Sequence, residues 1–332
     1  MTGIFSSMRK KVFVGFVSVV LVAVFFICPS IAQAETFPTK PITLIVAYSA
    51  GGGSDLAARI VAKYTEKYLG QPVVVENRPG AGGQIGFTAL AKAKPDGYTI
   101  GMLNVPALNM LAGVRENITY KSTDFEPLIN AILDPVVLAI PAKSDFKTLK
   151  DFIKFAKENP EKLILGVDGP QTNAQLQPIV MEKALGINIK YVFYNGAAPS
   201  LTAAIGGHTF GTTPGASEAK QYVENGQLRV LCVFSENRFP GLPDVPTFKE
   251  AAGVDISYIP SNRGFGVPSG TPADRKKIIE DAMKKAMNDP EFQAKAKEMG
   301  FPIFFEDAEA FKKKMDVADK EILQYKDLLV SK

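Results

Sequence analysis

The sequence predicts two α/β domains. Strand-like apolar runs alternate with helical patterns along the chain, which is typical of parallel sheets covered by helices. Residues 35–332 number 298, enough for two domains of roughly 150 residues. Pro135 also separates two strand-like runs where one continuous strand is expected, which indicates a passage between domains. We expect domain 1 to contain residues 35–133 and 237–332, and domain 2 to contain residues 134–236.

The first predicted unit is a strand that leads into a glycine-rich loop and a helix. The strand ITLIVAY ends at Tyr48, and the loop SAGGG follows it. Ser54 and Asp55 are N-cap candidates for an amphipathic helix over Leu56 to Leu69, which Gly70 ends. A helix N-terminus at the carboxyl end of a strand favours negative charge. This unit therefore predicts either an anion site or a tight strand-to-helix turn.

A second strand, QPVVVE, leads into another glycine-rich loop, NRPGAGGQIG, which opens another helix. Neither loop has the spacing of a nucleotide site. No Lys follows Gly53 or Gly83 as the Walker pattern requires, and AGGGSD is not G-x-G-x-x-G. Next come the strand YTIGMLN, a short helical stretch after Pro106, and the two runs that flank Pro135.

The middle of the chain repeats the strand, loop and helix pattern. A helix capped by Thr148, with Asp151 in the capping-box position, stops at Pro160. The strand KLILGV leads to the loop DGPQTN and a helix over Ala174 to Leu185. The strand IKYVFY leads to NGAAPS and a further helix. We expect LRVLCVFS to return the chain to domain 1, where PDVPT starts a helix, and a helix capped at Thr271 precedes two more.

The first 34 residues predict export. Arg9, Lys10 and Lys11 precede an apolar run, and a small-residue site at Ala32 to Ala34 follows, as in a cleavable signal peptide. A retained membrane anchor is disfavoured because the run is short, and lipidation at Cys28 lacks the small residues that it needs. Removing this segment lowers the net charge from +4 to +1, which argues against a nucleic-acid binder.

The residue inventory also argues against an enzyme or a metalloprotein. His208 is the only histidine, and no G-x-S-x-G elbow supplies a nucleophile. Cys232 is the one cysteine left after cleavage, so we expect no disulfide and no zinc site, and we interpret Cys232 as buried. A phosphate-utilising transferase would fit the glycine loops but not the export signal.

Several motifs resemble the Bug, or TctC-like, family of extracytoplasmic receptors of tripartite tricarboxylate transporters. The resemblance starts with residues 38–103, which contain ITLIVAYSAGGGSD and NRPGAGGQIG. It continues through YVFYNGAAPSLTAAIGGH, LPDVPTF and GFGVPSGTP, and so covers nearly the whole mature chain. The resemblance implies a type II periplasmic-binding-protein-like fold, in which two crossover strands connect the domains and a cleft lies between them.

The resemblance also implies a function and a site. We expect a periplasmic, monomeric receptor without cofactor or metal that captures a small organic carboxylate and delivers it to membrane permease subunits; a receptor for a membrane sensor kinase is the alternative. The ligand-binding residues would come from loops at the carboxyl ends of strands. They are Tyr48, Ser49, Ala50, Gly51, Gly53, Ser54, Asp55, Asn104, Gly169, Thr172, Asn173, Asn195, Gly196 and Ala197.

Some of these residues have a second interpretation. Asp55 is acidic, so we expect it to cap its helix or hold water, and Thr172 and Asn173 can also serve as caps. We expect Arg78 to brace the NRPGAGG loop, whereas Arg263 can lie at the rim or contact the ligand. The chain departs from the family at Ala47 and in DGPQTN, which leaves the identity of the ligand open.

Overall fold

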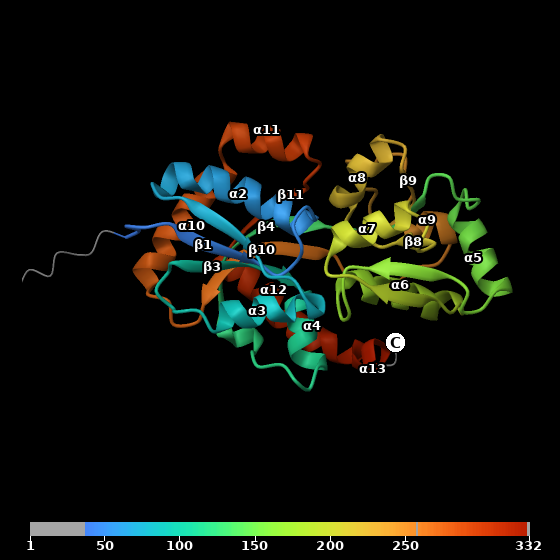
Figure 1. Cartoon of the computed structure of the whole chain (residues 1–332), viewed down its shortest axis with the longest axis horizontal. Coiled ribbons are helices and arrows are strands. Elements are labelled where there is room, and N and C mark those ends of the chain that lie inside the picture. Colours follow the sequence, from blue (N-terminus) through green and yellow to red (C-terminus); the bar gives the residue numbers. More distant parts are fainter. Residues whose placement is uncertain (1–36, 257, 331–332) are drawn as a thin grey trace, which may run out of the picture. The chain divides into compact units, whose positions relative to one another are not determined.

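The computed structural model describes residues 37–256 and 258–330. The predicted signal peptide, residues 1–34, lies outside the described residues, as do residues 35 and 36. The strands form two sheets, with the orders β11-β4-β10-β3-β1-β2 and β7-β6-β8-β5-β9 (Figure 1).

The first sheet is mixed. Its strands are β1 (Ile42–Val46), β2 (Val73–Asn77), β3 (Thr99–Val105), β4 (Phe125–Asp134), β10 (Ser261–Pro268) and β11 (Ile303–Asp307). Strand β1 pairs in parallel with β2 and β3, as predicted for the opening of the chain. Strand β10 runs antiparallel to both β3 and β4, and its Arg263 lies opposite Asn104.

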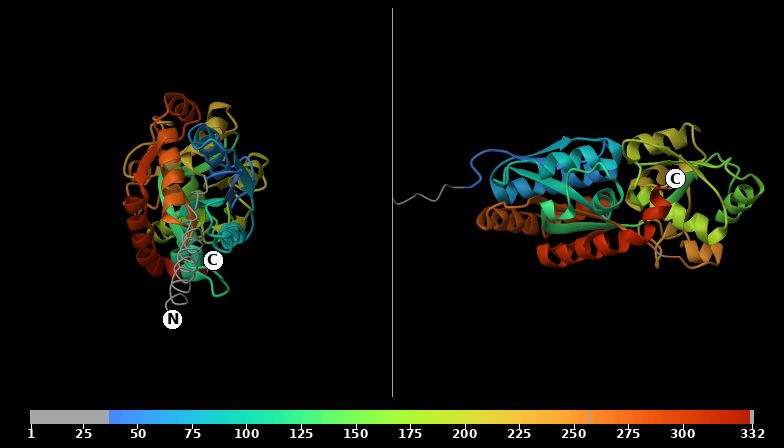
Figure 2. Two further views of the ribbon diagram at one scale, coloured as in Figure 1. Left: turned by 90° about the vertical axis from the view of Figure 1, so that its left-hand side faces the viewer. Right: turned by 90° about the horizontal axis from the view of Figure 1, so that it is seen from below.

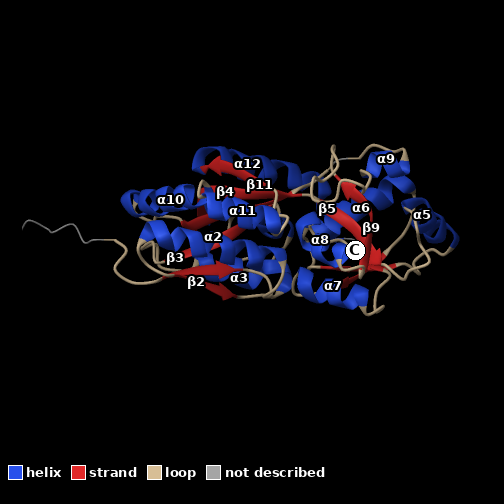
Figure 3. Ribbon diagram, turned by 90° about the horizontal axis from the view of Figure 1, so that it is seen from above, coloured by secondary structure: helices blue, strands red, loops and turns tan. Residues whose placement is uncertain are grey.

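Helices cover both faces of the first sheet. On one face, α2 (Gly53–Leu69) packs against β1, β2 and α10 (Ala273–Met287), and it also contacts α11 (Pro290–Glu298) (Figure 3). The other face carries α3 (Gln84–Ala91), α4 (Ala107–Val114) and α12 (Ala308–Glu321) (Figure 2). Phe87, Leu108 and Phe311 from these three helices share one buried core.

The remaining short elements of this half connect these layers. They are the 3-10 turns η1 (Ala81–Gly83), η2 (Ser122–Asp124) and η3 (Ile322–Tyr325), and the final helix α13 (Lys326–Val330).

The second sheet is also mixed. Its strands are β5 (Val136–Pro141), β6 (Ile164–Val167), β7 (Lys190–Phe193), β8 (Gly211–Thr212) and β9 (Leu228–Phe234). Its helices are α5 (Leu149–Glu158), α6 (Asn173–Leu185), α7 (Ala197–Ile205), α8 (Ala216–Glu224) and α9 (Phe248–Ala252). Because successive strand residues point to opposite faces, Leu138 packs towards α5, α6 and α9, whereas Val137 and Ala139 pack towards α7 and α8.

Two connections join the sheets. One lies at Pro135, since β4 ends at Asp134 in the first sheet and β5 begins at Val136 in the second. The second passage runs from β9 to β10, with α9 in between. The predicted placement of this helix with the first sheet is wrong, because Phe248 is fully buried in the core of the second sheet.

Helix ends differ from the predictions at three positions. Helix α2 begins at Gly53, so Ser54 and Asp55 lie in its first turn rather than at the N-cap. Thr172 stands at the N-cap of α6, but its hydroxyl donates to Asp168 instead of capping the helix. The hydroxyl of Thr271 donates to the carbonyl of Pro268, and α10 starts at Ala273. The predicted capping box of Thr148 and Asp151 is confirmed.

Candidate functional site

Loops from the two sheets meet where β1 ends. The amide of Ser49 donates to the carbonyl of Asn195 over 3.1 Å. Gly196 follows with φ of +130°, and a Cβ at this position would lie 2.6 Å from Oγ of Ser49. Only glycine permits this approach. Ser49, Asn195 and Gly196 therefore form a backbone contact between the two halves of the chain.

Next to this contact lies a small cavity, here called the inner cavity, of about 30 Å³. It brings together five of the predicted binding residues, namely Tyr48, Ser54, Asn104, Thr172 and Asn173. Three charged residues, Asp168, Glu218 and Arg263, also line it. The walls come from elements of both sheets, so the cavity exists only while the two halves are in contact.

A second hollow of about 200 Å³, here called the outer hollow, lies at the start of α2. Gly51, Gly52 and Gly53 line it, together with α8 residues that include Lys220. Glu218 lines the outer hollow as well as the inner cavity. Glu218 therefore belongs to the walls of both spaces.

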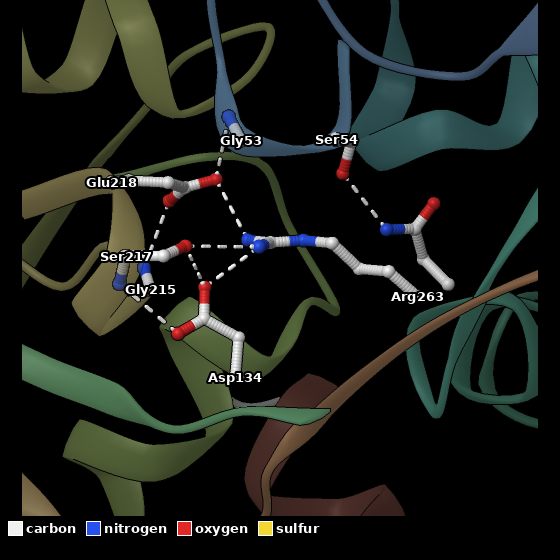
Figure 4. Close-up of polar contacts among 8 residues, drawn as sticks. Gly53, Ser54, Asp134, Gly215, Ser217, Glu218 and Arg263 are labelled. Carbon is white, nitrogen blue, oxygen red and sulfur yellow. Dashed lines mark hydrogen bonds and ion pairs between the residues drawn. The ribbon is translucent and has the colours of Figure 1, made fainter. Parts of the chain in front are cut away.

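The carboxylate of Glu218 accepts three hydrogen bonds, two from elements of the first sheet's half and one from the N-cap of its own helix (Figure 4). Its Oε1 accepts from the first amide of α2, that of Gly53, over 2.9 Å and from Nη2 of Arg263 over 2.8 Å. Its Oε2 accepts from the amide of Gly215 over 2.8 Å. Only 8% of the side chain is exposed, so these charge-assisted bonds lie in a medium that screens them little.

Arg263 connects this carboxylate to a second acid. Its Nη1 lies 2.6 Å from Oδ2 of Asp134, whose side chain is fully buried at the end of β4. Asp134 also accepts from the amide and hydroxyl of Ser217 in α8 (Figure 4). Since Arg263 belongs to β10 and Ser217 to α8, this network links the first sheet to the second next to both connections between them.

Burial sets the protonation equilibria of the site. Burial raises the pKa of Asp168 to about 7, although the hydroxyl of Thr172 and the charge of Arg263 oppose the shift. Burial also raises the pKa of Glu218, against the attraction of Arg263. Burial lowers the pKa of Arg263, but Asp134 and Glu218 outweigh that effect, so its pKa is raised and it stays charged.

Three buried polar atoms of the site have no hydrogen-bond partner among the described residues. They are Oδ1 of Asn104, Oγ of Ser49 and Nε of Arg263. The amide nitrogen of Asn104 donates to Oγ of Ser54, so the oxygen of the same amide, Oδ1, is left to accept from another group. Buried polar groups are nearly always satisfied in native proteins, so these atoms indicate a polar molecule or water at the site.

Comparison with known proteins identifies the family. The family described as tripartite tricarboxylate transporter family receptor (TctC) matches residues 57–328. The chain belongs to this family. It is 36% identical over 265 residues to the "UPF0065 protein in gbd 5'region" of Cupriavidus necator, a match that covers 80% of each chain.

Solved structures agree with the fold of the receptor. The periplasmic binding protein BugD is 27% identical, with a TM-score of 0.83 over 88% of this chain and 98% of BugD. An R. palustris protein solved with adipate is 25% identical, with a TM-score of 0.83 over 88% of this chain and 98% of its own. The predicted two-domain periplasmic-binding-protein-like fold is confirmed, and the likeness implies a solute-binding receptor in the periplasm.

Some predicted binding residues of the receptor line neither the inner cavity nor the outer hollow. Ala50 is exposed, and Ala197 is buried in the core beside α7. Asp55 accepts from the amide of Gly51 over 2.9 Å and from Arg59, but it does not stand at the N-cap of α2, so the predicted cap role is wrong. Gly169 packs against the second glycine loop. Whether any predicted residue contacts a solute stays a prediction.

Sequence reasoning missed Asp168, Glu218 and Asp134 as site residues of the receptor. Asp168 directly precedes Gly169 in the loop DGPQTN, which was predicted to carry binding residues. Its place in that loop could therefore have identified Asp168 as a site residue. Glu218 lies in a helix that the sequence did not predict. Arg263 is buried rather than at the rim and pairs with Asp134, and its contact with a ligand stays a prediction. Arg78 pairs with Glu76 over 2.8 Å at the surface.

The described part of the receptor shows neither a metal-binding cluster nor a membrane-spanning helix. Among residues 37–256 and 258–330, no group of His, Cys, Asp and Glu side chains is arranged to hold a metal ion. Nor does this part of the chain contain a helix of the length and apolar character that a membrane crossing requires.

Proposed function

We propose that the receptor captures a small organic carboxylate between its two halves and delivers it to the membrane permease subunits of a tripartite tricarboxylate transporter. One observation carries the proposal. The first amide of α2 and the guanidinium of Arg263 converge on a single carboxylate, that of Glu218. An arrangement that holds one carboxylate with a helix N-terminus and an arginine has the chemistry to hold another.

The donors of the site can supply a large part of the binding energy. A hydrogen bond to a charged group contributes roughly 1.5 to 3 kcal/mol, and micromolar binding needs about −8 kcal/mol. The Gly53 amide and Arg263 can donate such bonds to a ligand carboxylate, whereas the unpaired Oδ1 of Asn104 can accept a bond from a donor elsewhere on the ligand. The R. palustris relative that was solved with adipate supports the same class of ligand.

We also infer where the domains divide. A boundary one residue after the predicted one is supported by β4, which ends at Asp134 in the first sheet, and by β5, which begins at Val136 in the second. The return to domain 1 lies after α9 rather than at residue 237, because α9 packs with the second sheet. Residues 135 and 258–260 would then carry the hinge of a monomer that closes on its ligand.

A thermal-shift screen tests the proposed function. The mature protein is heated with acetate, adipate, malate, citrate and benzoate, and with ATP and NAD as controls. At a hundred times its dissociation constant a ligand stabilises the native state by about 2.7 kcal/mol, so we expect at least one acid to raise the melting temperature. A response to ATP or NAD with none to any acid would contradict the proposal.

A further inference from the structure

We propose that Glu218 is a resident competitor for the ligand's carboxylate and sets which acids the receptor accepts. The inference rests on the proposed function and adds to it a residue that opposes binding. It starts from the fact that the carboxylate position at α2 is filled by the protein itself.

The three donors around Glu218 form a complete carboxylate site. The Gly53 amide supplies a helix N-terminus, Arg263 supplies a charge, and the Gly215 amide supplies a third bond. An incoming carboxylate that bonds to Gly53 and Arg263 has to take the place of Oε1 of Glu218. The exchange replaces one negative charge by another, so the charge of Arg263 stays compensated.

The available space leads to the same conclusion. The inner cavity measures about 30 Å³ and the outer hollow about 200 Å³, so the inner cavity is the smaller of the two. Glu218 lines both spaces. Displacing its side chain would enlarge the room for a ligand carboxylate beside Gly53 and Arg263.

Unpaired polar atoms beside Glu218 indicate which groups of a ligand could occupy the space that the displaced side chain leaves. Oδ1 of Asn104, a residue that is 7% exposed and lines the inner cavity, has no partner among the described residues. Nε of Arg263, which is 4% exposed, has none there either. A ligand that reaches past Glu218 into the inner cavity can supply a donor to the first atom and an acceptor to the second.

Once displaced, Glu218 has a destination. Lys220 lines the outer hollow two residues further along the same helix, where its Nζ already pairs with Glu224. The displaced Glu218 carboxylate can turn into this hollow, although positions two apart on a helix do not face each other, so it would not pair with Lys220. The competition is therefore between a paired and a hydrated state of the same carboxylate.

Titration calorimetry on Glu218→Gln tests the competitor role. Wild type and variant are titrated with adipate, malate, citrate and benzoate. The neutral amide keeps the shape of Glu218 but bonds less strongly to Arg263 and Gly53. We expect the affinity for the best-bound acid to rise at least tenfold. Glu218→Asp, whose shorter side chain withdraws the carboxylate from Gly53 without changing the charge, should raise it as well.

Glu236→Gln is the matched control, because it removes a negative charge at an exposed residue that lines neither the inner cavity nor the outer hollow. We expect it to leave the affinity within twofold of wild type. An equal gain in Glu236→Gln would mean that overall charge, not competition, sets the affinity, and would overturn the inference.

The outcomes separate the two proposals. If wild type binds an acid and both Glu218 variants bind it equally or more weakly, Glu218 helps the ligand, and the competitor role is wrong while the proposed function stands. If neither wild type nor either variant binds any acid, both proposals fail. Circular dichroism confirms that each variant is folded before titration.

Discussion

The backbone of Gly169 packs directly against that of Gly82, such that a Cβ on Gly169 would lie 2.6 Å from Cα of Gly82. Gly82 belongs to the second glycine loop of the first sheet, and Gly169 follows β6 of the second sheet. Arg115 reinforces the contact, because its guanidinium donates to the carbonyls of both Ala81 and Pro170. The two halves of the receptor thus touch through backbone at this point, with no side chain in between.

Gly82→Ala should separate these loops. Its φ is +68°, and its Cβ would overlap the carbonyl oxygen of Pro170. We expect weaker binding of any solute that requires closure, and a larger radius of gyration by small-angle scattering. The backbone strain alone costs about 1 kcal/mol.

Gly70→Ala supplies the control for that strain. Gly70 has φ of +74° at the end of α2, and a Cβ there would meet no atom within 4 Å. It should lower the melting temperature as much as Gly82→Ala does and leave the radius of gyration unchanged. Equal scattering curves for both variants would show that the Gly82 contact does not hold the halves together.

Neighbouring glycines of the first loop should respond differently to alanine. A Cβ on Gly53 would overlap the carboxylate of Glu218, and any ligand carboxylate in its place. A Cβ on Gly52 would lie 3.6 Å from the nearest atom, the carbonyl oxygen of Ser49, in ordinary contact. We expect Gly53→Ala to weaken acid binding at least tenfold by calorimetry, which is about one charged hydrogen bond, and Gly52→Ala to bind as wild type does.

Removing Arg263 should destabilise the receptor strongly. Asp134 is fully buried, and without its partner it is an uncompensated charge. Breaking such a pair costs about 3 to 5 kcal/mol, so urea unfolding of Arg263→Met should show a loss of this size. Arg238→Met, in which both partners of the Arg238–Glu250 pair are about half exposed, should cost less than about 1 kcal/mol. Similar losses in the two variants would mean that the Arg263 network contributes little.

Stability should fall as pH rises towards neutrality because of Asp168. Its pKa is raised to about 7 in the folded state, whereas an unfolded Asp titrates near 4. Between these values the native state binds more protons, so its stability decreases with rising pH and levels off above about 7. The charged groups that face Asp168 are Arg263 and Glu218, with Tyr48 adjacent.

Asp168→Asn isolates this effect, since the amide oxygen can still accept from Thr172. The variant should gain stability relative to wild type as pH rises from 4 to 7, by up to about 4 kcal/mol. Chemical unfolding at a series of pH values measures the gain. Asp145→Asn, at an exposed site, is the control and should show no such gain. A constant difference between Asp168→Asn and wild type across this range would refute the titration of Asp168.

The sequence predicted the first strand, loop and helix of the first sheet well, because the patterns that specify them lie in short stretches of chain. The strand ending near Tyr48, the glycine loop and the helix to Leu69 follow from hydrophobic period and glycine placement alone. Five predicted residues of the inner cavity came from such loops, because carboxyl ends of neighbouring strands converge in this class of sheet.

The parts that the sequence did not reveal depend on distant contacts. Strand β10 contains Gly264 and Gly266, which disfavour a strand prediction, yet both are needed. Phe311 packs onto Gly264, and a Cβ on Gly266 would lie 2.5 Å from a side-chain atom of Leu103. Glu218 likewise bonds to Gly53 across 165 positions of sequence. Nothing near either residue in the chain indicates the partner.

The buried position of Cys232 makes its labelling rate a measure of local opening in one half of the receptor. The thiol is fully buried in β9, which pairs with β5, and burial raises its pKa well above the ordinary value. An alkylating reagent can therefore react only during moments when the second sheet opens locally. No other cysteine follows the predicted signal peptide. The rate at which a reagent labels the mature receptor therefore measures the opening of the second sheet alone and not that of the first sheet.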